Sequence, residues 1–104
     1  MGQDPAFSAT GAVTGDRITV TVTGEVDMST ADALFLAATP DRISGATIDL
    51  RAVTFFDSAA IHALIRLAER FPDGFEVIPS APVRRVLDIS GLSSQPWLVQ
   101  GEPG

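Results

Sequence analysis

The spacing of apolar residues changes twice between residues 45 and 79, and this change constrains the fold more than any other feature. Residues 46–50 read as a short strand, and the segment that begins at Ser58 has apolar residues at helical spacing. Residues 75–79, "FEVIP", again read as a strand, after Pro72 and Gly74 have ended the helix. A strand, a helix and a strand in succession indicate a crossover connection between parallel strands.

The flanking segments extend this pattern. Residues 17–27 alternate apolar side chains with threonines, which indicates a strand with one buried face, and residues 7–13 form a hairpin with it through the turn at 14–16. Residues 28–39 have helical spacing, with Ser29 as the predicted N-cap, and Pro40 ends this helix. Residues 80–92 predict a third helix, capped by a serine and ended by a glycine, and residues 97–100 are a candidate final strand.

The predicted fold class is therefore α/β. We expect a single small domain over residues 6–101, in which a mixed, mostly parallel sheet of four to five strands opens with a hairpin and is covered by three helices. The ends, 1–5 and 102–104, are expected to be flexible.

Composition excludes several functions. The chain has no cysteine and one histidine, so disulfides, thiolate chemistry and a transition-metal site are not expected. Its formal net charge of −6 argues against nucleic-acid binding. No segment resembles a signal peptide or a membrane span, which predicts a cytoplasmic protein without membrane contact.

The pair Asp57–Ser58 stands where a strand leads into the long helix, "FFDSAAI". Loops at the carboxyl ends of strands usually carry the sites of open α/β sheets, but Asp and Ser are also preferred N-cap residues, so position and residue type alone favour capping as the explanation of the pair. A serine at a helix N-terminus also suits phosphorylation, because free N–H groups and the helix dipole accommodate the phosphate. A phosphate there is expected to block docking of a partner and leave the fold intact.

Three segments, "TGEVDMSTADAL", "IDLRAVTFFDSAAIHAL" and "PSAPVRRVLDISGL", resemble the STAS domain family, in particular the bacterial anti-sigma factor antagonists. The resemblance implies a non-enzymatic module that binds an anti-sigma factor with serine kinase activity and so frees a sigma factor. It implies phosphorylation at Ser58, with Asp57 shaping the loop and Asp27 in the loop that faces it. ATP then belongs to the partner, and a phosphatase is a further expected partner.

The match departs from the family after Ser58, where Ser or Thr followed by Gly-Leu is usual and this chain has Ala59, Ala60 and Ile61. The predicted partner-binding residues, some of which fit a purely structural role equally well, are Asp27, Met28, Phe56, Asp57, Ser58, Ala59, Ala60 and His62. Phe55 and Phe56 are expected to point in opposite directions, with at least one of them in the core.

Two other functions stay open. One is a STAS-type subunit of another assembly, such as an accessory regulator of a transporter ATPase or a stress-signalling complex, in which Ser58 is only a helix cap. The other is a hydrolase that uses Ser58 and His62, which the absence of a G-x-S-x-G motif disfavours. The chain also has no glycine-rich phosphate-binding motif, so no cofactor is expected.

Overall fold

The computed structural model describes residues 7–99, which form one four-stranded sheet and three helices. The strands are β1 (Phe7–Thr14), β2 (Arg17–Val26), β3 (Gly45–Phe56) and β4 (Phe75–Pro79). The helices are α1 (Ala31–Ala37), α2 (Ser58–Arg70) and α3 (Ala81–Ile89). The strand order is β1-β2-β3-β4, with β1 antiparallel to β2 and the other two pairs parallel. The predicted fold class, including the N-terminal hairpin, is confirmed.

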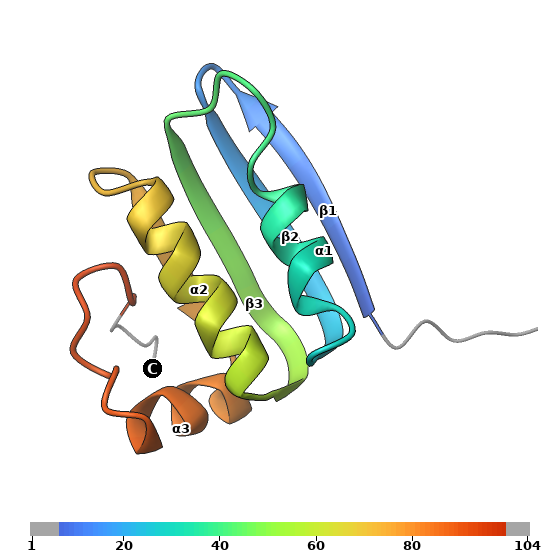
Figure 1. Ribbon diagram of the computed structural model, residues 1–104, viewed down its shortest axis with the longest axis vertical. Coiled ribbons are helices and arrows are strands. Elements are labelled where there is room, and N and C mark those ends of the chain that lie inside the picture. Colours follow the sequence, from blue (N-terminus) through green and yellow to red (C-terminus); the bar gives the residue numbers. More distant parts are fainter. Residues whose placement is uncertain (1–6, 100–104) are drawn as a thin grey trace, which may run out of the picture.

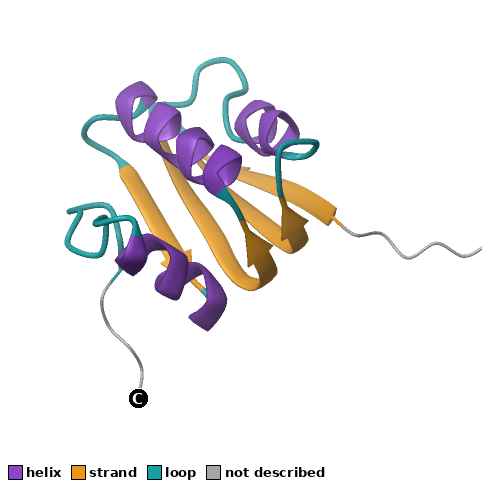
Figure 2. Ribbon diagram, turned by 60° about the horizontal axis from the view of Figure 1, so that its bottom comes forward, coloured by secondary structure: helices purple, strands orange, loops and turns teal. Residues whose placement is uncertain are grey.

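Helices α1 and α2 lie on the same face of the sheet (Figures 1 and 2), because both belong to crossovers that move in the same direction along it. Alternate residues of β2 point toward these helices, and Ile18, Val20 and Val22 are buried. The threonines between them lie on the opposite, polar face, where Arg17 donates a hydrogen bond to Thr47 (3.0 Å). One face of the sheet therefore carries the core.

Helix α2 supplies much of that core from the buried residues Ala60, Ala63, Leu64 and Leu67. Its predicted start at Ser58 and its end before Pro72 are confirmed. Helix α3 lies beside the end of β3 that leads into α2 (Figure 1), and its buried residues are Val83 and Leu87. The helices thus cover the sheet with their apolar sides.

Strand β3 is longer than predicted. The sequence pattern assigned residues 46–50, but the strand continues to Phe56 because β2 continues beside it to Val26. The pairing between the two strands shifts twice, between Thr21 and Thr23 and between Gly24 and Glu25. Gly24 has φ 88°, a conformation in the left-handed region that favours glycine.

The start of the first helix was predicted wrongly. Ser29 does not cap it, because it lies two residues before the first helical residue, and its hydroxyl donates a hydrogen bond to Asp27 Oδ1 (2.7 Å). The helix begins at Ala31, after Thr30, which makes no side-chain cap bond. Residues 27–30 form a turn that precedes the helix.

The chain after α3 forms no fifth strand in the described residues. Leu98 makes an isolated parallel bridge to Val77 of β4. Gln100, with which the predicted strand ended, lies outside the described residues, as do both termini that were expected to be flexible.

Candidate functional site

Two loops lie side by side where β2 and β3 end. Val26 and Phe56 are paired across the two strands, and Asp27 and Asp57 follow them directly. The Asp57 N–H donates a hydrogen bond to the Val26 carbonyl (3.3 Å), which joins the two loops. We call Asp27, Met28, Asp57 and Ser58 the β2–β3 end. Parallel pairing therefore brings together two of the sequence segments that were predicted to form one site (Figure 1).

At the start of α2, the aspartate is the cap and the serine is not. Asp57 Oδ1 accepts a hydrogen bond from the Ala60 N–H (3.0 Å), while the Asp57 backbone is extended. Ser58 is the first helical residue, its side chain is exposed, and its hydroxyl makes no hydrogen bond to any residue between 7 and 99. The two residues therefore have different roles, and the Ser58 hydroxyl is free to react.

The backbone at this helix start favours a negative group. The first four N–H groups of a helix have no partner within it. Those of Ala60 and Ile61 bond to the Asp57 side chain and carbonyl, respectively, which leaves the N–H groups of Ser58 and Ala59. Together with the helix dipole they are able to stabilise an anion on the Ser58 oxygen.

Asp27 orders the neighbouring loop. Its Oδ1 accepts hydrogen bonds from the Ser29 N–H (2.9 Å), the Ser29 hydroxyl (2.7 Å) and the Thr30 hydroxyl (3.3 Å). These hydrogen bonds, led by that of the Ser29 hydroxyl, lower the pKa of Asp27. The carboxylate is therefore ionised at neutral pH and holds Ser29 and Thr30 in the turn that follows it.

The side chains around Ser58 differ widely in exposure. Met28 is 82% exposed and Phe55 is 48% exposed, whereas Phe56 is 4% exposed and belongs to the core. The assignment of Phe56 to the contact surface is therefore corrected, because its side chain is covered, and Phe55 is the accessible aromatic residue. Ala60 is also fully buried, so its side chain is not available to a partner either.

The remaining predicted residues do not form a catalytic arrangement. His62 is exposed, and neither Ser58 nor any other residue of the described range 7–99 forms a hydrogen bond with its side chain. Within the same range, no group of three His, Cys, Asp or Glu residues is placed to hold a metal ion, and no helix is long and apolar enough to cross a membrane. Among the described residues, no side-chain base forms a hydrogen bond with the exposed Ser58 hydroxyl, which is the contact that a Ser-His nucleophile uses.

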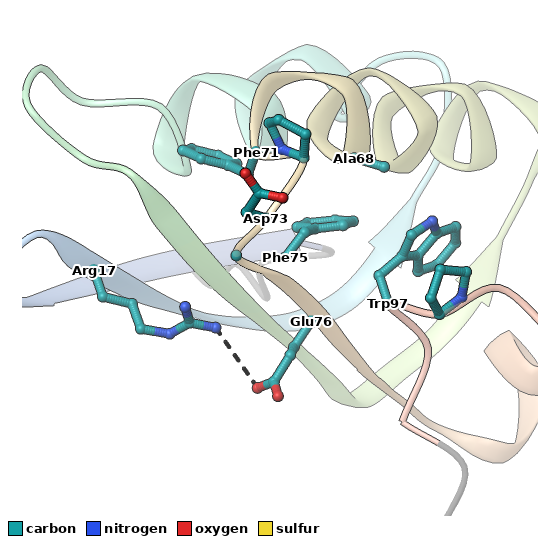
Figure 3. A pocket seen from close by; sticks show the side chains of 10 residues that line it. Arg17, Ala68, Phe71, Asp73, Phe75, Glu76 and Trp97 are labelled. Atoms are coloured by element: carbon teal, nitrogen blue, oxygen red, sulfur yellow. Dashed lines mark ion pairs between the residues drawn. The ribbon is translucent and has the colours of Figure 1, made fainter.

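A pocket of about 370 Å³ lies at the other end of α2, away from Ser58. Figure 3 shows Trp97 and Phe75 together in it, with ring centroids 5.6 Å apart, and Arg17 paired with Glu76 at 3.7 Å. Two of the charged residues that line it pair with each other, and Trp97 packs against Phe75 at the start of β4. We assign this region to packing.

Sequence reasoning missed a second hollow, of about 380 Å³, between the end of β3 and α3. Its lining includes Phe55, Pro82, Arg85 and Val86. A signal was present, because Pro82, Arg85, Val86 and Ile89 recur at helical spacing outside the buried stripe of α3.

Comparison with known proteins places this geometry in context. The family model described as "STAS domain" matches residues 10–101. The crystal structure of an anti-sigma factor antagonist from Mycobacterium paratuberculosis is 30% identical, with a TM-score of 0.77 over 91% of this chain and 86% of that one. Among curated proteins, none matches the chain significantly.

Two more distant structures share the fold. The unphosphorylated form of the anti-sigma factor antagonist SpoIIAA is 19% identical, with a TM-score of 0.68 over 93% of this chain and 89% of that one. The phosphorylated form of SpoIIAA, a Bacillus cell fate determinant, is 19% identical, with a TM-score of 0.67 over 93% of this chain and 92% of that one. The family model covers most of the chain, and the solved structures agree with it in fold, so the chain belongs to the STAS domain family.

Proposed function

We propose that the protein is an anti-sigma factor antagonist, which binds an anti-sigma factor with serine kinase activity and thereby releases a sigma factor. Its likeness to the antagonist from Mycobacterium paratuberculosis supports the general role. The observation that carries the proposal further is the exposed Ser58 hydroxyl, which does not cap α2 because Asp57 does. This hydroxyl lies at the same end of the sheet as the exposed Met28.

Phosphorylation of Ser58 ends the complex in this proposal. The Ser58 oxygen attacks the γ-phosphorus of ATP bound by the partner, the bond from that phosphorus to the β–γ bridging oxygen breaks, and ADP leaves. The serine proton passes to a base of the kinase. The protein itself supplies no catalytic group, and a phosphatase restores the hydroxyl by hydrolysis.

The new charge acts on docking more than on folding. A phosphoserine carries about −1.5 to −2 charge at pH 7. Within the protein, the N–H groups of Ser58 and Ala59 and the dipole of α2 compensate for it. A partner that covers the β2–β3 end has to desolvate this charge beside the carboxylate of Asp57, so the complex is destabilised.

The contact surface in this proposal consists of the exposed and half-exposed residues at this end, which are Asp27, Met28, Asp57, Ser58, Ala59 and His62. Ala60, one of the departures from the usual family motif, is fully buried and does not change this surface. Ala59 is half-buried and does change it.

Ala59 favours one alternative. Without a second hydroxyl beside Ser58, a partner that recognises both hydroxyls does not recognise this chain. The second candidate is therefore a STAS-type subunit of another assembly, such as a transporter ATPase or a stress-signalling complex, that docks through the same end without phosphorylation.

The proposal is tested by measuring the affinity of the protein for anti-sigma factors of its own organism. We expect Ser58→Asp to weaken binding about tenfold or more, which corresponds to about 1.4 kcal/mol, and Ser58→Ala to bind as the unchanged protein does. Ser94→Asp, at an exposed loop serine, adds the same charge elsewhere and serves as the control.

The free energy of unfolding of Ser58→Asp is expected to stay within about 1 kcal/mol, because an acidic residue is tolerated at a helix N-terminus. Equal binding by Ser58→Asp and Ser94→Asp contradicts the switch. So does unfolding of Ser58→Asp, since the switch requires the fold to persist.

A further inference from the structure

The hollow between β3 and α3 has features that packing alone does not explain. We call it the α3 groove and define it by Phe55, Pro82, Arg85 and Val86, which are among the residues that line its volume of about 380 Å³. Phe55 is 48% exposed, and Ile89, one helical turn beyond Arg85, is 80% exposed. An apolar surface at the centre and a charged residue at the side are features of an interaction site.

The walls of the groove are fixed to each other. The Ser80 hydroxyl donates a hydrogen bond to the Val53 carbonyl (2.7 Å), which ties the start of α3 to β3. Val83 and Leu87 are fully buried, and Phe56, beneath the exposed Phe55, is 4% exposed. The groove therefore exists before any partner binds, and docking loses little conformational entropy on this side.

Arg85 gives the groove its charge. The neighbouring Arg84 donates a hydrogen bond to the Val99 carbonyl (3.1 Å). Arg85 is exposed and forms neither a hydrogen bond nor an ion pair with any residue in the described part of the chain. In a protein of formal net charge −6, an unpaired guanidinium beside exposed aromatic surface marks a local place for a carboxylate.

The groove is close to the β2–β3 end along the chain. Phe55 and the buried Phe56 are the last two residues of β3, and Asp57 and Ser58 follow them directly. A partner that covers Ser58 therefore has a residue of the groove, Phe55, three positions away in the chain. The groove enlarges the contact area without contributing to phosphorylation.

We infer that the α3 groove receives a segment of the anti-sigma factor that carries an apolar side chain next to a carboxylate, with the apolar group against Phe55 and Val86 and the carboxylate on Arg85. This inference rests on the proposed function and adds a second contact to it. It assigns to α3 a part in partner selection, because the rest of the acidic surface repels an acidic segment.

The test compares affinities of four variants for the anti-sigma factor that binds the unchanged protein. Arg85→Glu and Phe55→Ser are expected to weaken binding about tenfold or more each. Their matched controls are Arg42→Glu, at another exposed arginine without an ion pair, and Val13→Ser, at a residue that is 55% exposed on β1. The controls are expected to bind within about twofold of the unchanged protein.

Two further measurements sharpen the result. Urea unfolding of Arg85→Glu has to match that of Arg42→Glu, which excludes a folding defect. The affinity of the unchanged protein is expected to fall more steeply between low and high salt than that of Arg85→Glu, because a charge pair is screened.

The outcomes separate the two proposals. If the unchanged protein binds anti-sigma factors and Arg85→Glu binds as tightly as Arg42→Glu, the groove inference is overturned and the proposed function stands. If the unchanged protein binds none of them, both fail. If sedimentation instead shows a dimer that Arg85→Glu abolishes, the groove belongs to a second copy of this chain and the inference is also overturned.

Discussion

Two serines stand at helix starts in this protein, and their hydroxyls are used differently. Ser80 precedes α3, is half-buried, accepts a hydrogen bond from the Val83 N–H (3.3 Å) and donates one to the Val53 carbonyl (2.7 Å). Ser58 begins α2, is exposed, and makes no side-chain hydrogen bond within residues 7–99. At α2 the cap is the carboxylate of Asp57.

The difference shows how a helix start is left available for regulation. A phosphate on Ser80 would replace the proton that its hydroxyl donates to the Val53 carbonyl, so this hydrogen bond between α3 and β3 would be lost. When an aspartate takes over capping, the serine one residue later is free to change its charge without loss of the cap. In this protein, Asp57 thus stabilises the helix and Ser58 is left for regulation. Three predictions test this division of roles, and a fourth tests the neighbouring loop at Asp27.

The largest stability effect is expected for Ser80→Ala. The substitution removes the cap of α3 and leaves the Val53 carbonyl without this donor, so the free energy of unfolding should fall by about 2 kcal/mol. Urea denaturation measures the change. If the free energy of unfolding falls by less than about 0.5 kcal/mol, the two hydrogen bonds of Ser80 contribute little. Ser80 and Ser58 then do not differ in their structural role.

Asp57→Ala is expected to have the next largest effect. It removes the only side-chain cap that the structure shows on α2, at a cost of about 1 kcal/mol, and Asp57→Asn should recover most of this because its carbonyl oxygen accepts the same bond. Denaturation of both variants at pH 7 provides the check. Equal destabilisation by Asn and Ala contradicts the capping role.

Asp27→Asn is expected to change the dependence of stability on pH in acid. The folded state lowers the pKa of Asp27, so its contribution to stability is present above the pKa of the unfolded chain, about 4, and is lost as pH falls through the lower folded value. The Asn variant should therefore lose less stability than the unchanged protein between pH 5 and pH 3, measured by urea denaturation.

Asp49 is the control for that experiment. A side-chain hydrogen bond from Arg51 lowers the pKa of Asp49 on the polar face of the sheet, so Asp49→Asn should also reduce the acid dependence. The prediction is contradicted if Asp49→Asn loses less stability in acid than the unchanged protein and Asp27→Asn loses the same amount. The Asp27 carboxylate then has no role in stability.

The smallest effect is expected for Ser58→Ala. Because the hydroxyl makes no hydrogen bond in the described part of the chain, its removal should change the free energy of unfolding by less than about 0.5 kcal/mol. A destabilisation as large as that of Ser80→Ala means that Ser58 has a structural role, and the division of roles fails.

Much of the fold was predictable from local patterns. The alternation in β2, the helical spacing of α2 and the serine at the start of α3 each express one physical preference, and tertiary contacts agree with all three. The start of α1 was not predictable in the same way. Ser29 is a good cap in isolation, but the Asp27 carboxylate accepts hydrogen bonds from both its N–H and its hydroxyl, which holds Ser29 in the turn before the helix.

The site was predicted only in part, because the alternation of a strand does not extend across bulges. In β3, Ile48 and Leu50 point into the core, but after the first register shift Val53 does so, and after the second Phe56 does. The sequence indicated that at least one of the two phenylalanines is buried, and it did not determine that Phe56 is the buried one. The α3 groove, which depends on Phe55, was missed for the same reason.

The most direct test of the central claim is intact-mass analysis of the protein after incubation with ATP and the anti-sigma factors of its own organism that have serine kinase activity. Ser58→Ala and Ser80→Ala are treated in parallel. We predict that the unchanged protein and Ser80→Ala each gain a single phosphate and that Ser58→Ala gains none. A phosphate that persists in Ser58→Ala, or stable complexes without any phosphorylation of the unchanged protein, contradicts the role assigned to Ser58.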